Sequence, residues 1–174
     1  MEKILKTADK RKSYSLDEKM VAAQVSDAPA PVYLGGRGNY LPFHTSKPQS
    51  KMTAFEKIGL IRDGISKKDF EGFKQKAGLD YDQLAATLSV ARATLINKKG
   101  TEKFNQTLSE KIVSLADIYA YGYEVFEDTE RFNNWIFRPN QALGGLPPFD
   151  FLDNQYGREE VKDLIGRIDY GVYS

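Results

Sequence analysis

Residues 80–99 have the sequence DYDQLAATLSVARATLINKK, and this stretch decides the predicted fold class. Asp80 and Gln83 have the spacing of a capping box, which predicts that a helix begins here and runs over residues 81–88. A break at Ser89-Val90 then leads into a second helix. Two short helices separated by a tight turn are typical of a helix-turn-helix. The small core of that motif is expected to consist of Leu84, Ala85, Leu88, Val90 and Leu95.

The second helix of such a motif lies in the major groove of DNA and presents its N-terminal residues to base edges. Arg92 suits guanine and Asn97 suits adenine, because each side chain can make paired hydrogen bonds with that base. The predicted DNA contacts are Arg92, Ala93, Thr94, Ile96, Asn97, Lys98 and Lys99. Ala91 is unusual, because it stands where serine or threonine commonly caps a helix, and loss of such a cap costs about 1 kcal/mol. The alternative is a three-helix scaffold that only resembles a DNA-binding unit.

Two further helices are predicted before this motif. Apolar residues at three- and four-residue steps predict a first helix with one buried face, which Gly64 ends. Ser66 is expected to cap the second helix, and Gly78 to end it. The buried positions are expected to be Met52, Phe55 and Ile58, with Ile61 and Ile65, for the first helix, and Phe70, Phe73 and Ala77 for the second.

Three more helices are predicted after the motif. A capping box that starts at Thr107 predicts where the first begins, and Gly122 marks either its end or a tight crossing. Asp128 or Thr129 is expected to cap the next, and the last is expected over about residues 158–168. The inward side chains are predicted to be Leu108, Ile112, Leu115, Ala116, Tyr119 and Tyr123, then Phe132, Trp135 and Ile136, then Val161, Leu164, Ile165 and Ile168.

Only a brief run at residues 31–34 alternates as a strand does, so the chain is predicted to be all-α. Residues 1–50 are expected to be an N-terminal extension that is flexible, partly disordered or a short helix. Residues 51–104 are expected to form the helix-turn-helix domain, and residues 105–174 a small helical domain. Within residues 105–174, Asn140 is expected to cap a short turn, and the paired glycines and prolines that follow are expected to make a sharp corner.

The extension contains a possible helix and a glycine-rich loop. Ser15 and Glu18 have capping-box spacing, which predicts a helix over about residues 16–25. The loop Gly35-Gly-Arg-Gly38 lacks the Gly-Lys-Ser/Thr ending of a phosphate-binding loop and the GxGxxG spacing of a dinucleotide fold. We therefore interpret it as a linker.

Composition excludes several classes of function. Of the 174 residues 41% are apolar, but no window approaches the roughly 20 consecutive apolar residues of a membrane span. The first residues lack the apolar run of a secretory signal, so a cytoplasmic location is expected. The absence of cysteine excludes disulfides and thiol catalysis, and His44, the only histidine, lies in a Pro/Gly-rich segment that is a poor setting for catalysis. We predict no catalytic residue, no cofactor and no metal site, and so no enzyme.

Charge is distributed unevenly along the chain. The net charge of +1 combines +3 over residues 1–50, +4 over residues 51–104 and −6 over residues 105–174. A polyanionic partner therefore suits only the front part of the chain. The chain also ends on Arg167-Ile-Asp-Tyr-Gly-Val-Tyr-Ser174, although chain ends are normally polar unless something holds them. We expect this end to pack against a partner protein.

These features together resemble the Xre/MbcA/ParS antitoxins of bacterial type II toxin–antitoxin modules. The resemblance runs from about Phe55 to Ser174 and includes the helix-turn-helix at Leu84-Ala85…Val90…Thr94-Leu95. That motif is generic. The block Trp135…Pro139-Asn-Gln-Ala-Leu-Gly-Gly-Leu-Pro-Pro148, followed by Gly157 and the terminal Tyr-Gly-Val, is more specific.

The resemblance implies a cognate RES-domain toxin that degrades NAD, and a C-terminal tail that enters or covers the toxin's NAD pocket. It also implies operator binding that regulates the operon, and a homodimer. The toxin contacts that it implies are Arg167, Tyr170, Gly171, Val172, Tyr173 and Ser174. The alternative is a DNA-binding transcriptional regulator whose C-terminal domain only dimerises.

Overall fold

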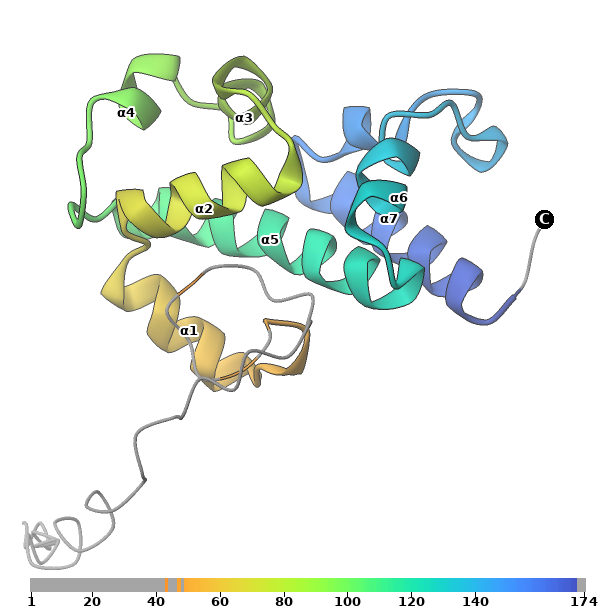
Figure 1. Ribbon diagram of the computed structural model, residues 1–174, viewed down its shortest axis with the longest axis horizontal. Helices are drawn as coiled ribbons and strands as arrows, with labels where there is room; N and C mark the ends of the chain where they lie inside the picture. The colour runs from red at the N-terminus through yellow and green to blue at the C-terminus, as the bar shows by residue number, and fades with distance from the viewer. Residues whose placement is uncertain (1–42, 44–46, 48, 172–174) are drawn as a thin grey trace, which may run out of the picture. The chain divides into compact units, whose positions relative to one another are not determined.

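The structure is a computed structural model that describes Phe43, Lys47 and residues 49–171, and this part of the chain is all-helical (Figure 1). It contains no strand, and its β-type pairing is limited to isolated bridges such as Ser66 with Lys103. The all-α prediction is therefore confirmed. The elements are η1 (Gln49–Lys51), α1 (Ala54–Asp63), α2 (Lys67–Ala77), α3 (Tyr81–Thr87), α4 (Arg92–Ile96), α5 (Gln106–Phe126), α6 (Thr129–Trp135), η2 (Gln141–Leu143), η3 (Pro148–Phe151) and α7 (Gln155–Asp169).

The central element is α5, whose 21 residues span about 30 Å at 1.5 Å per residue. It packs against α1, α2, α6 and α7, and η1 also lies on it. Figure 1 shows α2 and α1 along one part of α5, and α6 and α7 along the other. The inward residues predicted for α5, from Leu108 to Tyr123, are all buried. One long apolar helix therefore connects the helix-turn-helix to the C-terminal elements.

Local sequence signals set the boundaries of the helices around the motif. Ser66 caps α2, because its hydroxyl accepts a hydrogen bond from the amide of Asp69, and Gly78 ends α2 with the left-handed φ of 66° that glycine tolerates. At the start of α3, Asp80 and Gln83 form both hydrogen bonds of the predicted capping box. These boundaries are confirmed as predicted.

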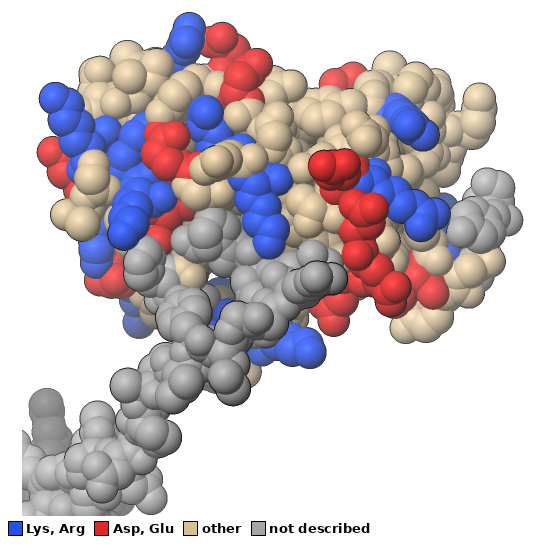
Figure 2. Space-filling model, viewed as in Figure 1, with Lys and Arg blue, Asp and Glu red and all other residues tan. Residues whose placement is uncertain are grey.

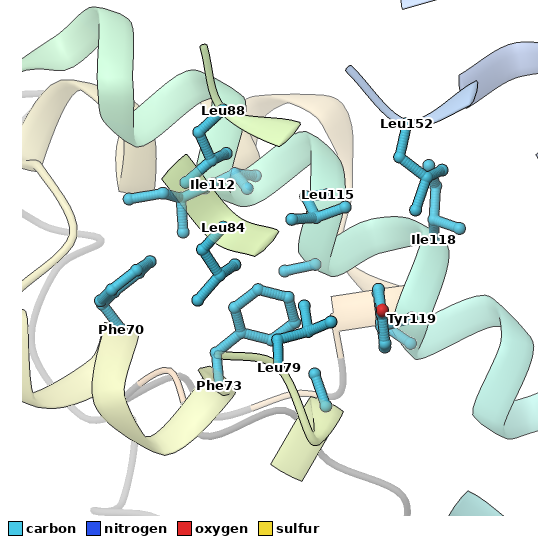
Figure 3. Packing of buried hydrophobic residues seen from close by; sticks show 14 of the residues in the cluster. Phe70, Phe73, Leu79, Leu84, Leu88, Ile112, Leu115, Ile118, Tyr119 and Leu152 are labelled. Carbon is cyan, nitrogen blue, oxygen red and sulfur yellow. The ribbon is translucent and has the colours of Figure 1, made fainter. Parts of the chain in front are cut away.

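The core of the motif forms where α2, α3 and α5 meet. Leu84 of α3 and Leu88, which follows the helix as its C-cap, are fully buried, as are Phe70 and Phe73 of α2. In Figure 3 these side chains lie close to Ile112 and Leu115 of α5. Leu95 of α4 belongs to the same apolar cluster. Burying a side chain of this size stabilises the folded chain by about 1.5–3 kcal/mol, because its apolar surface is removed from water.

Two glycines allow close approach among the C-terminal elements. A Cβ at Gly122 in α5 would lie 2.1 Å from Cε2 of Phe132 in α6. This glycine marks a tight crossing, while α5 continues to Phe126. A Cβ at Gly157 in α7 would lie 1.9 Å from the carbonyl oxygen of Phe151. Neither position has room for a larger residue, so the packing of α6 and α7 depends on both.

The prediction for the buried face of α1 is wrong at Phe55 and Ile58 and confirmed at Ile61 and Ile65. The helix ends at Gly64 as expected, but Phe55 is 85% exposed and Ile58 is 42% exposed. The helix packs through the predicted Ile61 and through Leu60, which was not predicted. Its orientation on α5 is also set by polar contacts, because Lys57 Nζ lies 2.7 Å from Asp117 Oδ2. The apolar spacing of α1 therefore predicted the helix correctly but only part of its inner face.

The predicted start of α5 is also wrong. Asn105 caps the helix by accepting a hydrogen bond from the amide of Leu108, so α5 begins at Gln106, and Thr107 is an exposed residue within its first turn. The signals for the following elements are confirmed. Asp128 caps α6, Asn140 caps η2, and α7 is slightly longer than predicted, with Asn154 as its cap.

Some predictions lie outside the described residues, namely the helix over residues 16–25, the loop over residues 35–38, and His44. Within the described residues, no helix is both long enough and apolar enough to cross a membrane. No group of three or more histidine, aspartate or glutamate side chains in this part of the chain is arranged to bind a metal ion.

Candidate functional site

The recognition helix α4 is short and largely exposed. It has five residues, and Leu95 is the one that is buried. The predicted contact residues Arg92, Ala93, Thr94, Ile96, Asn97 and Lys99 are exposed, and Lys98 is half-buried. Ile96 is an apolar side chain that is 41% exposed, which suits contact with a thymine methyl group. The structure therefore brings the seven predicted residues together on one surface segment.

The N-terminus of α4 receives no side-chain cap from its N-cap residue, Ala91. Ala91 adopts the extended conformation of an N-cap residue but makes no side-chain hydrogen bond to the helix. The preceding turn is strained at Ser89, which has a φ of 52°, a conformation that costs L-residues about 1–2 kcal/mol. The sequence stretch Ser89-Val90 predicted the turn, but not this left-handed residue.

Lysines from neighbouring helices bind the C-terminal carbonyls of both helices of the motif. Lys67 Nζ donates a hydrogen bond of 2.6 Å to the carbonyl oxygen of Leu95 in α4. Lys111 Nζ of α5 donates one of 2.9 Å to the carbonyl oxygen of Leu88 at the end of α3. A cation at a helix C-terminus also interacts favourably with the helix dipole. Sequence reasoning missed both lysines, because the contacts join residues 28 and 23 positions apart.

Arg92 has an acidic neighbour in α3. Its Nε lies 3.4 Å from Asp82 Oδ1, and both side chains are more than half exposed. A surface pair of this kind contributes at most about 1 kcal/mol, so the guanidinium remains able to exchange partners. In Figure 2 lysine and arginine gather over the end of the molecule that carries α2 and α4, with a few acidic side chains among them. This surface is suited to a polyanion.

The other predicted site lies at the end of α7. Tyr170 follows the helix and is 82% exposed, and Gly171 has a φ of 68°. Arg167 is half-exposed and lies 3.9 Å from Glu160, a long distance for an ion pair. Val172, Tyr173 and Ser174, the other residues of this predicted site, lie outside the described residues.

The surroundings of this helix end are acidic. Burial raises the pKa of the Tyr121 hydroxyl, and nearby negative charge on Asp169, Glu124 and Asp163 raises it further. Figure 2 shows a band of aspartate and glutamate on the side of the molecule toward the C-terminus. The two predicted sites thus differ in charge, as the net charges of their sequence regions indicated.

A hollow of about 450 Å³ between α5 and α7 has mixed charge and no catalytic arrangement. Its lining includes Lys111, which binds the carbonyl oxygen of Leu88, and Arg158, which binds that of Leu152 at 2.8 Å. Burial lowers the pKa of Arg158. These cations connect neighbouring elements, so the hollow has a structural explanation.

Two sequence-family models match the chain in these regions. Residues 56–117 match the antitoxin Xre-like helix-turn-helix domain, and residues 122–171 match the antitoxin Xre/MbcA/ParS C-terminal toxin-binding domain. The chain belongs to the Xre/MbcA/ParS antitoxin family. The antitoxin thus has a DNA-binding domain of the helix-turn-helix type and a toxin-binding domain, which imply DNA and a cognate toxin as partners. Membership of this family also confirms that it is not an enzyme.

Similar proteins carry antitoxin names. The "Prs ADP-ribosylating antitoxin" of Sphingobium sp. (strain YBL2) is 26% identical over 151 residues, which cover 79% of this antitoxin and 93% of the relative. "Antitoxin Xre" of Photorhabdus laumondii is 32% identical over 76 residues, which cover 43% and 51% of the two chains. "Antitoxin Xre" of Yersinia enterocolitica is 24% identical over 129 residues, which cover 73% and 86%.

Proposed function

We propose that the antitoxin neutralises a RES-domain toxin that degrades NAD, and that the tail, residues 170–174, enters or covers the toxin's active site. The observation that carries this proposal is the 82% exposure of Tyr170 at the end of α7. An aromatic ring left in solvent by its own chain is the kind of side chain that anchors an interface when it fills a partner's pocket. Gly171 would let the backbone pass close to the pocket wall.

The remaining residues of the proposed toxin contact would act through charge or by filling the pocket. Arg167 would pair with an acidic group of the toxin, since its contact with Glu160 is long. The carboxylate of Ser174 would meet a basic group that otherwise holds an NAD phosphate, and Val172 and Tyr173 would fill the pocket mouth. The net charge of −6 over residues 105–174 suits a basic site.

The choice of an NAD-consuming toxin has two supports. The first is the resemblance of the block from Trp135 to Pro148 and of the terminal residues to antitoxins of RES-domain toxins. The second is the name of the Sphingobium relative, which refers to ADP-ribosylation. An ADP-ribosyl group is supplied by NAD, so that name points to the same substrate.

The antitoxin would also bind its own operator, as a homodimer, and so regulate its operon. Arg92 and Asn97 would contact base edges, with Ala93 and Ile96 providing apolar contact. Thr94, Lys98 and Lys99 would contact phosphates, which makes binding salt-dependent. In this proposal residues 51–104 supply DNA binding and residues 105–174 supply toxin binding and dimerisation.

The second candidate is a transcriptional regulator whose C-terminal domain only dimerises. The match of residues 122–171 to a toxin-binding domain favours the antitoxin. The two functions also differ in their genetic setting, because an antitoxin gene is expected next to a toxin gene.

The test co-expresses the antitoxin with the product of the adjacent gene and measures cell growth and cellular NAD. Deletion of residues 170–174 is expected to abolish neutralisation and leave operator binding unchanged. Y170A should weaken neutralisation, whereas Y156A is a matched control, since Tyr156 is also 82% exposed but lies at the opposite end of α7. Full neutralisation by the deletion variant would reject the proposed mechanism, and unchanged NAD with toxin alone would reject the proposed toxin class.

A further inference from the structure

The ammonium group of Lys67 is enclosed where α2, α3 and α4 meet. The Lys67 side chain is 9% exposed, and its Nζ lies 2.5 Å from Glu71 Oε1. It also lies 2.7 Å from the Tyr81 hydroxyl and 2.6 Å from the carbonyl oxygen of Leu95. Tyr81 in turn donates its hydroxyl hydrogen to Glu71. An ammonium group has three N–H donors, so these three acceptors use all of them and none is left for a DNA phosphate.

We propose that Lys67 is a positioning residue for operator binding, which fixes the recognition helix α4 in place without contacting DNA. This inference rests on the proposed binding of operator DNA through α4. Lys67 is not part of the DNA-contact surface. Its proposed role explains how so short a helix as α4 is held in one orientation.

α4 needs such a contact because the helix is only marginally stable by itself. Isolated helices shorter than about 12 residues are marginal in water, and α4 has five. Its N-terminus has no side-chain cap, because Ala91 has no acceptor to offer. The last carbonyls of any helix lack partners within the helix, and Lys67 supplies one to Leu95 together with a favourable charge. The polar link at the C-terminus therefore compensates for the missing cap.

The same cluster keeps Lys67 charged. Burial alone would lower its pKa, but the hydrogen bonds with Glu71 and Tyr81 and the charge of Glu71 hold the pKa above its ordinary value. The contact between α2 and α4 is therefore a hydrogen bond from a charged donor to the carbonyl oxygen of Leu95 at any pH suitable for DNA binding. The neighbouring Lys68, in contrast, is exposed, so burial of a lysine is not a general feature of the start of α2.

The test compares three single lysine variants of the full chain on a duplex taken from the region upstream of its own reading frame. K67M removes the ammonium group and keeps most of the volume, K99M removes a predicted phosphate contact, and K51M changes an exposed lysine of η1 outside the motif. K67M is expected to weaken binding about tenfold with an unchanged slope of log K against log salt. K99M is expected to reduce that slope by about 0.9, and K51M to change neither quantity.

Hydrogen exchange adds a measurement that does not need DNA. The amide of Asn97, which binds the carbonyl oxygen of Ala93, should exchange faster in K67M than in the wild type, while amides of α7 and binding of the toxin stay unchanged. Should K67M fail to fold, Y81F decides the question, because it removes one partner of Lys67 and keeps the partly buried ring. Y81F is expected to weaken operator binding about threefold.

Three results would overturn the proposal: full operator affinity in folded K67M, full affinity in Y81F, or a salt slope for K67M reduced as in K99M. The last would mean that Lys67 contacts phosphate. Failure of the wild type to bind the duplex would instead refute operator binding, and hydrogen exchange of Asn97 would still show whether Lys67 holds α4.

Discussion

The recognition helix α4 and the terminal helix α7 are held in place by different kinds of interaction. α4 has five residues, contributes one buried side chain, Leu95, and depends on the buried ammonium of Lys67. α7 has fifteen residues, a buried apolar face and a glycine, Gly157, in contact with backbone. Changes of charge or pH should therefore affect DNA binding most, whereas changes of side-chain volume should affect toxin binding most.

The largest effect is expected for G157A, which tests the role of volume at α7. The new methyl group would lie 1.9 Å from the carbonyl oxygen of Phe151, and backbone cannot move aside as a side chain can. We expect a loss of about 3 kcal/mol in the free energy of unfolding, measured with urea, and loss of toxin binding in a pull-down assay.

The matched control is G59A in α1, where a Cβ would have no atom within 4 Å. Removing a glycine from an exposed helix interior should stabilise the chain by about 0.5–1 kcal/mol. A G157A variant as stable as the wild type would show that α7 is not held by close packing.

A smaller effect is expected at low pH, where protonation of Glu71 should weaken the cluster that holds α4. Burial would raise the pKa of Glu71, but hydrogen bonds from Lys67 and Tyr81 and the charges of Lys67 and Lys74 hold it below its ordinary value of 4.5. The unfolded chain therefore takes up this proton at a higher pH than the folded chain does. The stability that Glu71 contributes is present above pH 4.5 and is lost as the pH falls below it.

Amide protection factors, followed by hydrogen exchange as the pH falls through this range, should therefore decrease in α4 before they decrease in α7. E71Q should remove the pH dependence at α4, and E160Q, on the exposed face of α7, should leave it intact. Earlier loss of protection in α7 would contradict the proposed difference between the two helices.

A smaller change is expected from capping. A91S supplies a hydroxyl at the uncapped N-terminus of α4 and should raise the free energy of unfolding by about 1 kcal/mol, with tighter operator binding. N154A removes the existing cap of α7, where Asn154 Oδ1 accepts a hydrogen bond from the amide of Gly157, and should lower the free energy by about the same amount. Thermal unfolding measures both, and no gain from A91S would mean that Lys67 already holds α4 fully.

The smallest effect is expected at the exposed pair of Arg92 and Asp82. D82N releases Arg92 and removes a negative charge beside the DNA-binding surface. We expect the Kd for duplex DNA to fall about threefold, equivalent to roughly 0.6 kcal/mol, as measured by fluorescence anisotropy. D150N, at an exposed carboxylate of η3, is the control and should change nothing.

Much of the fold could be predicted because its signals are local. Ser66, Asp80 and Asp128 each cap a helix through amides two or three residues away, so their roles depend on nearby sequence only. The inner face of α1 could be predicted only in part in this way, at Ile61 and Ile65. Phe55 and Ile58 have the right spacing, but contacts with α5 decide which side of α1 is covered.

The same distinction applies to the candidate sites. The exposed residues of α4 could be predicted from the spacing of the helix-turn-helix, because Arg92 to Lys99 directly follow its turn. Lys67 and Asp82 act on that surface from other helices, and no spacing rule connects them to it. The exposed Tyr170 at the end of α7 was expected from the apolar character of the chain end, whereas its acidic surroundings depend on residues of both α5 and α7.

The continuity of α5 has a practical consequence for anyone who wishes to study the two activities in isolation. The matched regions end at residue 117 and begin again at residue 122, both within the same helix. Cutting the gene between them would divide that helix and uncover apolar side chains such as Tyr119. Point substitutions on an intact polypeptide are therefore the sound way to silence one activity and retain the other.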